Sequence, residues 1–409
     1  MLSRPGTGLV ILLLAASLAR AQDASRSRIE REASAQAAQA DRLFKAGRFD
    51  AALKLYRAEA ESRKALGDAR YEAYAHRGVG CCLERLKEDE GAIDAFKAAM
   101  AIDAGRDDPG FAGYDGLLTA QAQLRLGRAA DAVESLKKAL PRLGQAVDRD
   151  HECDARVCLV QGRLALGEAA RALPDAARAL ALTRELDDPR RLANAWLALG
   201  LVDRDLGRLG PALMRLQDAR DAYRDQSREA DDALATRHLA DVAYRLGDRS
   251  RAAALFEEAA ELHAKLNDIA SEAGDRLDLA SVRLDLGDAA SSAREAERAR
   301  DGFLGSDDES SAIDALVVLA KAQSLAKDKD ALATAAATVR DALARSARVH
   351  ADAPAERVRL LLLSADLESR LGRKVDVSSR LSEASKVAES ADDPLLRSAV
   401  TEARKRLTP

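Results

Sequence analysis

Apolar and small residues recur along this chain with a spacing of about forty residues. Runs in which apolar residues return every three or four positions predict amphipathic helices. These runs close repeatedly on a small or turn-prone residue, and successive turns are 40 residues apart six times, then 39 and 46 residues apart. The nine predicted turns are at Gly47, Lys87, Gly127, Gly167, Gly207, Gly247, Gly287, Ala326 and Gly372. A fixed period of this length predicts an array of stacked repeats.

Each repeat has the same internal pattern when it is aligned on its turn residue. Positions seven before and five after the turn are mostly small, as at Gly80 and Ala92, which allows two antiparallel helices to approach closely. Nine residues after the turn, larger apolar residues such as Phe96 fill the space between repeats. Each repeat is therefore predicted to be a helix pair whose apolar side is completed by its neighbours. We expect an all-α fold of about nine helix pairs with a capping helix at 395–407.

Two features depart from the regular pattern. Lys87 and Ala326 stand where most repeats have glycine, and we expect the chain to avoid positive φ angles there. The interval from Ala326 to Gly372 is the longest and contains the segment 350–354, which ends in proline. We therefore expect an enlarged link between the eighth and ninth repeats.

The repeats resemble the tetratricopeptide repeat. The residues that fall at the spacings of its consensus are Trp196, Leu199, Gly200, Gly207 and Ala212 in one repeat, and Gly80, Ala92, Phe96, Ala99 and Pro109 in another. The forty-residue period is similar to the longer-helix variant of kinesin light chains and of bacterial regulators of the maltose-activator type. This resemblance extends from about Ser27 to Leu407. It implies one right-handed α-α superhelical solenoid over 22–409 that binds proteins or peptides in a concave groove.

The resemblance also implies which positions line that groove, namely those 13, 10, 6 and 3 residues before each turn. Tyrosine and arginine are the side chains most enriched at binding hot spots, and amide side chains suit contacts to a peptide backbone. The candidate contacts are Tyr74, Arg77, Tyr114, Gln121, Gln161, Asn194, Arg204, Arg237, Asp241 and Tyr244. The alternative is that these residues make only local ion pairs. The paired Lys and Asn of the family's carboxylate clamp are absent.

The first residues have the features of a secretory signal peptide. Arg4 provides a positive start, Leu9–Leu18 is apolar, and Ala19–Ala21 is an A-x-A cleavage site. The apolar run is about half of the roughly 20 residues that a membrane-spanning helix requires, which disfavours an uncleaved anchor. Cleavage after Ala21 leaves Gln22 first and predicts a periplasmic or secreted protein without an integral membrane segment.

Charge and composition narrow the class of partner. The signal peptide contains two arginines and no acidic residue, so 62 basic residues face 68 acidic ones in the remaining chain. No cluster of Lys and Arg marks a nucleic-acid or anionic membrane surface, which disfavours nucleic acid as a partner. Aromatic residues make up only 3% of the chain, and this scarcity favours closely packed helices over strands.

No arrangement of chemically active residues predicts a catalytic, metal or cofactor site. The five histidines form no H-x-x-x-H or H-E-x-x-H pair, and the adjacent His151, Glu152 and Cys153 point in different directions on a helix. The four cysteines are Cys81, Cys82, Cys153 and Cys158. Their spacing does not fit disulfides within helices, so we expect them to be apolar packing residues, with a reactive thiol or an intermolecular bridge as the alternative.

Together these features predict an exported, non-enzymatic scaffold that binds protein or peptide partners in its groove. An envelope assembly or secretion complex is the setting that export suggests. Two other functions are compatible with the same features. The protein is then either a sensor or targeting subunit that acts with a separate enzyme, or a structural protein that self-assembles into oligomers through its open-ended stacking surfaces.

Overall fold

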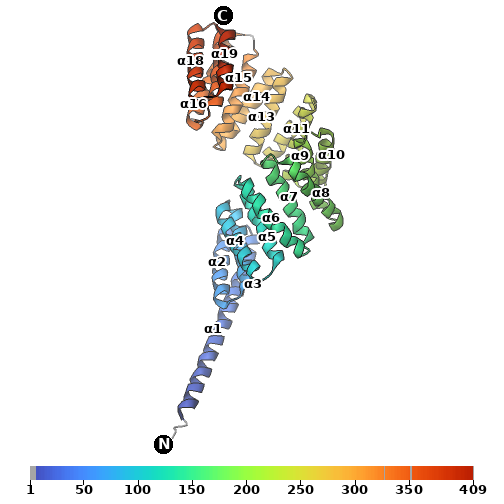
Figure 1. Cartoon of the computed structure of the whole chain (residues 1–409), viewed down its shortest axis with the longest axis vertical. Coiled ribbons are helices and arrows are strands. Elements are labelled where there is room, and N and C mark those ends of the chain that lie inside the picture. Colours follow the sequence, from blue (N-terminus) through green and yellow to red (C-terminus); the bar gives the residue numbers. More distant parts are fainter. Residues whose placement is uncertain (1–5, 327, 351, 409) are drawn as a thin grey trace. The chain divides into compact units, whose positions relative to one another are not determined.

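A computed structural model describes residues 6–326, 328–350 and 352–408 of the chain. Within these residues there are nineteen α-helices and no strand, and the helices follow one another along the chain (Figure 1). They divide into two compact units, Met1–Leu206 (unit 1) and Gly207–Pro409 (unit 2). The prediction of an all-α fold with nine helix pairs and one final helix is confirmed. The single solenoid over 22–409 stays a prediction.

Unit 1 contains the first nine helices, and within it each helix packs against the next. Their bounds are α1 (Gly6–Lys45), α2 (Phe49–Leu66), α3 (Ala69–Arg85), α4 (Asp89–Gly105), α5 (Pro109–Arg125), α6 (Ala129–Gln145), α7 (Arg149–Ala165), α8 (Ala169–Leu186) and α9 (Pro189–Asp205).

Unit 2 contains the remaining ten helices, which pack in the same sequential way. Their bounds are α10 (Leu209–Asp225), α11 (Glu229–Arg245), α12 (Arg249–Lys265), α13 (Ile269–Asp285), α14 (Ala289–Gly305), α15 (Glu309–Ser324), α16 (Lys329–Val349), α17 (Pro354–Arg370), α18 (Lys374–Ser390) and α19 (Pro394–Leu407). The predicted capping helix is α19, which packs against α17 and α18.

Each helix from α1 to α14 is followed by a residue in the left-handed region, so the turns recur every 20 residues rather than every 40. These residues are Gly47, Gly67, Lys87, Asp107, Gly127, Val147, Gly167, Asp187, Gly207, Ser227, Gly247, Asn267, Gly287 and Asp307. In every one of them φ lies between 49° and 85°. A left-handed residue at this place closes the last helical turn and reverses the chain.

The expectation that Lys87 avoids a positive φ is wrong, because its φ is 63°. The Glu88 N–H donates to the Leu83 carbonyl over 2.9 Å, as the Arg128 N–H donates to the Gln123 carbonyl over 2.8 Å beside the glycine turn at Gly127. The closing hydrogen bond requires the left-handed conformation, so the turn imposes it on lysine despite a cost of about 1–2 kcal/mol.

The packing positions are buried as the pattern predicts. Ala40, Ala52, Ala92, Ala120 and Leu136 all have an exposed fraction of 0%. The small residues matter because of the distance between helices. A Cβ atom at Gly80 would lie 2.8 Å from Cζ of the Phe96 ring, so a larger residue would push α3 away from α4.

The eighth and ninth repeats differ from the predicted register. α16 begins at Lys329, forty residues after Ala289, the first residue of α14. The forty-residue period therefore continues, and α16 begins one residue later than a turn at Ala326 would give. Residue 327 itself lies outside the described residues. α16 has 21 residues, whereas α14 and α18 have 17 each. The expected enlarged link at 350–354 is therefore wrong in its location, because most of the inserted length extends α16 as a helix up to Val349.

None of the described helices is both long enough and apolar enough to cross a membrane. α1 continues through the predicted cleavage position after Ala21. Residues 1–5 of the predicted signal peptide lie outside the described residues.

Candidate functional site

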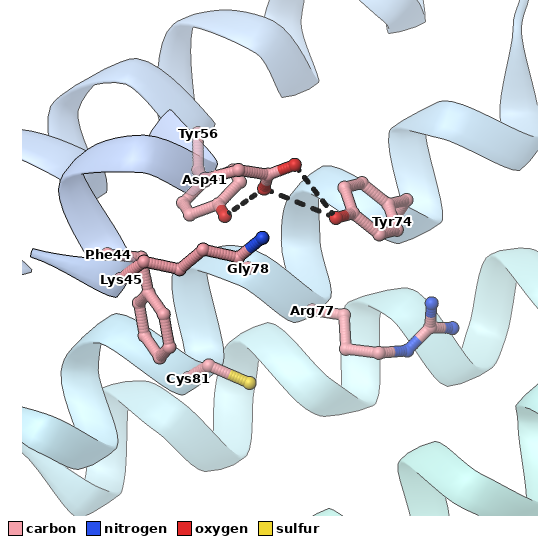
Figure 2. Close-up of a pocket in the computed structure, with 8 residues that line it drawn as sticks. All are labelled: Asp41, Phe44, Lys45, Tyr56, Tyr74, Arg77, Gly78 and Cys81. Atoms are coloured by element: carbon pink, nitrogen blue, oxygen red, sulfur yellow. Dashed lines mark hydrogen bonds between the residues drawn. The ribbon is translucent and has the colours of Figure 1, made fainter. Parts of the chain in front are cut away.

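A pocket of about 300 Å³ lies between the first helices of the first two repeats, α1 and α3, with α2 behind them (Figure 2). We call it the tyrosine pocket. Its lining residues are Asp41, Phe44, Lys45, Tyr56, Tyr74, Arg77, Gly78 and Cys81. Tyr74, Arg77 and Cys81 stand 13, 10 and 6 residues before the turn at Lys87, so the pocket occupies the positions that the repeat pattern assigns to the groove.

Asp41 joins two tyrosines at the centre of the tyrosine pocket. The Tyr56 hydroxyl donates to Asp41 Oδ1 over 2.5 Å, and the Tyr74 hydroxyl donates to the same oxygen over 3.2 Å (Figure 2). Burial, together with the Asp41 carboxylate, raises the pKa of both tyrosines. Tyr56 is buried, whereas Tyr74 is 43% exposed. Tyr74 therefore presents a fixed and partly accessible aromatic ring.

Gly78 makes this arrangement possible. A Cβ atom at this position would lie 2.7 Å from Cδ1 of the Tyr56 ring, closer than a carbon contact allows. The absence of a side chain therefore lets the Tyr56 ring lie against α3, where its hydroxyl reaches Asp41.

Arg77 is held by an ion-pair network inside unit 1. Its Nη2 lies 2.7 Å from Asp103 Oδ2, and its Nε lies 2.6 Å from Asp115 Oδ1. The Arg77 side chain is only 11% exposed and Asp115 is fully buried. Burial raises the pKa of Asp115 to about 6, against the opposing effect of Arg77. Arg77 thus joins α3 to α4 and α5, and its charge is already neutralised by carboxylates of the chain.

A second pocket, of about 490 Å³, borders the first and shares Asp41 and Tyr74 with it. We call it the acidic pocket. Its lining residues are Glu30, Ser34, Ala37, Ala38, Asp41, Glu59, Arg63, Asp68, Tyr71 and Tyr74. Glu59 has an exposed fraction of 0%, and neither of its carboxylate oxygens has a hydrogen-bond partner.

The other candidate residues of unit 1 lie on later repeats. The Tyr114 ring stacks near His151, with ring centroids 4.3 Å apart, and the Arg77 guanidinium lies 5.9 Å from the centre of the same tyrosine ring. Gln121 and Asn194 are partly buried, and Gln161 is exposed. Arg204 donates from Nε to Asp205 Oδ1 over 2.8 Å. The structure thus brings Tyr74, Arg77 and Tyr114 together, and it places Gln121, Gln161, Asn194 and Arg204 on α5, α7 and α9.

The three candidates of unit 2 each have a partner within that unit. The pairs are Arg237 Nε with Asp275 Oδ1 (3.3 Å), Arg245 Nε with Asp241 Oδ2 (3.1 Å) and the Tyr244 hydroxyl with Asp285 Oδ2 (2.7 Å). Tyr244 is 39% exposed, and its hydroxyl bonds to Asp285 on α13, the first helix of the following repeat. In the same way, the Tyr74 hydroxyl bonds to Asp41 on α1, the first helix of the preceding repeat.

Some residues of the tyrosine pocket and the acidic pocket were not among the contact residues predicted from the sequence. Asp41 and Phe44 stand 6 and 3 residues before the turn at Gly47, so the same offsets, if extended to the first repeat, would have found them. No such signal marks Tyr56, Glu59 or Arg63, because they lie on α2, a second helix. Their contribution depends on how α2 packs behind α1 and α3.

The histidine and cysteine residues do not gather into one cluster in the described part of the chain. His151 Nδ1 lies 2.7 Å from Asp148 Oδ2, and Glu152 pairs with Arg149 and Arg156. No group of three or more His, Cys, Asp or Glu side chains able to hold a metal ion occurs among the residues that were described. All four cysteines are free thiols, and burial raises the pKa of Cys81 to about 11.

The fold and these stacked pairs define an all-α helix-repeat protein. No model of a protein family matches the chain, and no curated protein matches it. Solved structures with similar folds are repeat proteins. A signal-transduction ATPase with numerous domains and a tetratricopeptide repeat sensor, from Pyrococcus horikoshii, is 14% identical with a TM-score of 0.66; the match covers 88% of this chain and 54% of that protein. The present chain therefore spans about half of that relative's length.

Two further structures support the same fold. A Rap protein complexed with Competence and Sporulation Factor is 15% identical, with a TM-score of 0.53 and coverage of 86% of this chain and 99% of that one. A tetratricopeptide repeat protein from Parabacteroides merdae is 13% identical, with a TM-score of 0.51 and coverage of 70% and 99%. The chain has the fold of a tetratricopeptide-repeat solenoid.

Proposed function

We propose that this protein is an exported, non-enzymatic scaffold that holds a protein or peptide segment against the first helices of its repeats. The tyrosine pocket is its main contact point. The observation that carries this proposal is that the pocket lies at the groove positions of two successive repeats and presents the partly exposed Tyr74 ring. Concave sites of roughly 300–1,000 Å³ suit small ligands and single anchoring side chains, and tyrosine is enriched at binding hot spots.

The chemistry of the tyrosine pocket favours binding over catalysis. A thiol acts as a nucleophile only when it is deprotonated, and the Cys81 thiol, with its pKa raised to about 11, is protonated at neutral pH. The tyrosine hydroxyls are likewise protonated, because burial and Asp41 raise their pKa values. These groups donate and accept hydrogen bonds without being activated for reaction.

Two of the similar structures support a role in recognition. One is a Rap protein with a bound factor, and the other contains a sensor built from tetratricopeptide repeats. Since these likenesses concern the fold, the partner of this chain has to be identified directly.

Export is the second part of the proposal, and it rests on Met1–Ala21. N-terminal sequencing of the protein from fractionated cells tests it. We expect Gln22 as the first residue and recovery from the periplasm or the medium, in keeping with a role in an envelope assembly or secretion complex. An intact Met1 in the cytoplasmic fraction would contradict export.

Affinity capture from envelope extracts tests binding, with each captured protein then purified and its affinity measured. Tyr74→Ala removes the exposed ring of the tyrosine pocket, and we expect it to lower the affinity at least tenfold. Met214→Ala is the control, because Met214 is 69% exposed on α10, a second helix. Equal affinity of wild type and Tyr74→Ala would reject the pocket. A captured enzyme would favour the sensor alternative, and light scattering that shows oligomers would favour self-assembly.

A further inference from the structure

Glu59 is a buried carboxyl group without a hydrogen-bond donor. Its exposed fraction is 0%, and neither Oε1 nor Oε2 accepts a hydrogen bond. Buried polar groups are normally satisfied, and an exception calls for a specific explanation. Asp115 is equally buried, but its two oxygens accept hydrogen bonds from Arg77 over 2.6 and 3.0 Å. Glu59 therefore differs from Asp115 in having unused acceptor capacity, and it has this capacity beside a pocket.

The nearest cation, Arg63, does not satisfy Glu59. The Arg63 Nε lies 3.7 Å from Glu59 Oε1, beyond hydrogen-bond distance. Its Nη1 donates to Asp68 over 3.1 Å, and its Nη2 donates to Ser34 over 3.1 Å. The guanidinium also lies 4.5 Å from the centre of the Tyr71 ring. Only the Nε of Arg63, which has no hydrogen-bond partner, faces Glu59, so Arg63 offsets part of the Glu59 charge without satisfying its oxygens.

The charges that line the acidic pocket are unbalanced. Carboxylates come from α1 at Glu30 and Asp41, from α2 at Glu59, and from Asp68 at the start of α3, whereas Arg63 is the one cation among the lining residues. Opposite charge within this concave, partly desolvated space would be attracted strongly. The pocket is thus complementary to a positive group that carries several N–H donors.

We propose that the acidic pocket binds a lysine or arginine side chain of a partner protein segment, with Glu59 as the buried counter-ion. This inference rests on the proposed scaffold function and names the chemistry of its partner. The free acceptors of Glu59 receive N–H bonds from the bound group. The Tyr71 ring already contacts the Arg63 guanidinium, so the Tyr74 ring, which is 43% exposed, is the aromatic surface that contacts the bound cation.

The position of the acidic pocket suits a segment that also occupies the tyrosine pocket. The two pockets share Asp41 and Tyr74, so one extended segment contacts both. A cavity of about 490 Å³ accommodates a long basic side chain. We therefore expect the partner to present a basic residue close to the residue that packs on Tyr74.

The binding should depend on pH. Burial raises the pKa of Glu59 to about 7, partly offset by Arg63 and reinforced by Asp41 and Asp68. Glu30 of α1 and the two tyrosines of α3 also line the pocket. A cation pairs with the ionised carboxylate, so binding strengthens as the pH rises from about 6 to about 8 and releases a proton below about pH 7.

A fluorescein-labelled peptide of alternating alanine and lysine, about twelve residues long, serves as the probe. Its binding to the full chain is measured by fluorescence anisotropy near 0.15 M salt, where long-range attraction is screened. Peptides with glutamate or glutamine in place of lysine are the comparison probes. We expect Glu59→Gln to weaken binding of the lysine peptide about tenfold. Glu61→Gln, an equal charge change at an exposed position of the same helix, should alter it less than twofold.

Equal binding by wild type and Glu59→Gln would overturn the inference, as would equal weakening by Glu61→Gln, which would indicate only the overall charge. Circular dichroism verifies that both variants are folded. The proposed function is judged separately, because Tyr74→Ala leaves Glu59 in place. Loss of a captured partner in Tyr74→Ala, with no effect of Glu59→Gln, would retain the scaffold and reject the cation site.

Discussion

Replacing Glu59 by glutamine should stabilise the first two repeats at high pH and leave them unchanged at low pH. In the folded chain the pKa of Glu59 is raised from 4.5 to about 7, chiefly by burial. Each unit of pKa shift corresponds to about 1.36 kcal/mol, so ionising Glu59 costs the folded state about 3 kcal/mol. Because the folded pKa is the higher one, this cost is absent below about pH 4.5, grows as the pH rises and is complete above about pH 7. Glutamine does not ionise and avoids it.

Hydrogen exchange measured by mass spectrometry resolves the effect within unit 1. Repeat arrays can open locally, so we compare peptides from α2 and α3 rather than a whole-chain melting temperature. The ratio of exchange rates between wild type and variant at one pH cancels the intrinsic pH dependence of exchange. A difference of about 3 kcal/mol corresponds to roughly two orders of magnitude in this ratio. We expect exchange in Glu59→Gln to be slower by about this factor at pH 8, and similar to wild type near pH 4.5.

Glu61→Gln is the matched control, and it should show no pH-dependent difference. A ratio for Glu59→Gln that is the same at both pH values would refute the argument that Glu59 ionises at a cost. Faster exchange in the variant at pH 8 would refute it as well, because it would mean that the attraction between Glu59 and Arg63 outweighs the burial of the charge.

Three further predictions can be tested by the same hydrogen-exchange measurement, in peptides around each substituted residue. Arg77→Met leaves the buried Asp115 without its cation, whereas Asp103 keeps Arg106, and should lower the unfolding free energy by about 3–5 kcal/mol; a change below about 1 kcal/mol would contradict the network. Gly78→Ala forces a methyl group against Tyr56 and should cost about 1–3 kcal/mol, whereas Gly144→Ala, with open space around it, should be neutral or stabilising by up to about 1 kcal/mol; equal effects would refute the close approach. Val147→Gly relieves a β-branched residue at φ 56° and should add about 1 kcal/mol, and a loss of stability would argue against strain there.

Most of the fold could be predicted because its determinants are local. The turn glycines, the small residues that lie against neighbouring helices and the larger apolar residues repeat with the helical period, and they define the helix pairs. α16 was less predictable. The residues inserted after Ala326 are compatible with either a link or a helix, and their packing as about one extra turn of α16 depends on tertiary contacts. Lys87 adopts a left-handed angle for a similar reason, since the reversal of the chain imposes it.

The candidate site was predictable only in part. The repeat offsets placed Tyr74 and Arg77 in one pocket. They did not reveal that Arg77 is occupied by ion pairs, because Asp103 and Asp115 lie 26 and 38 residues away in sequence. Arg77 makes these ion pairs within unit 1, and its assignment as a partner contact stays a prediction.

The sequence by itself determined that the chain is an array of helix pairs, because helical periodicity and turn chemistry act over a few residues and repeat at a fixed interval. It also carries the export signal as a prediction. Only the tertiary structure decided which charged side chains have ion-pair or hydrogen-bond partners and which do not, because burial and pairing depend on side chains from several helices. Arg77 and Glu59 are both charged residues on regular helices. Packing gave Arg77 two carboxylate partners and left the Glu59 oxygens without donors.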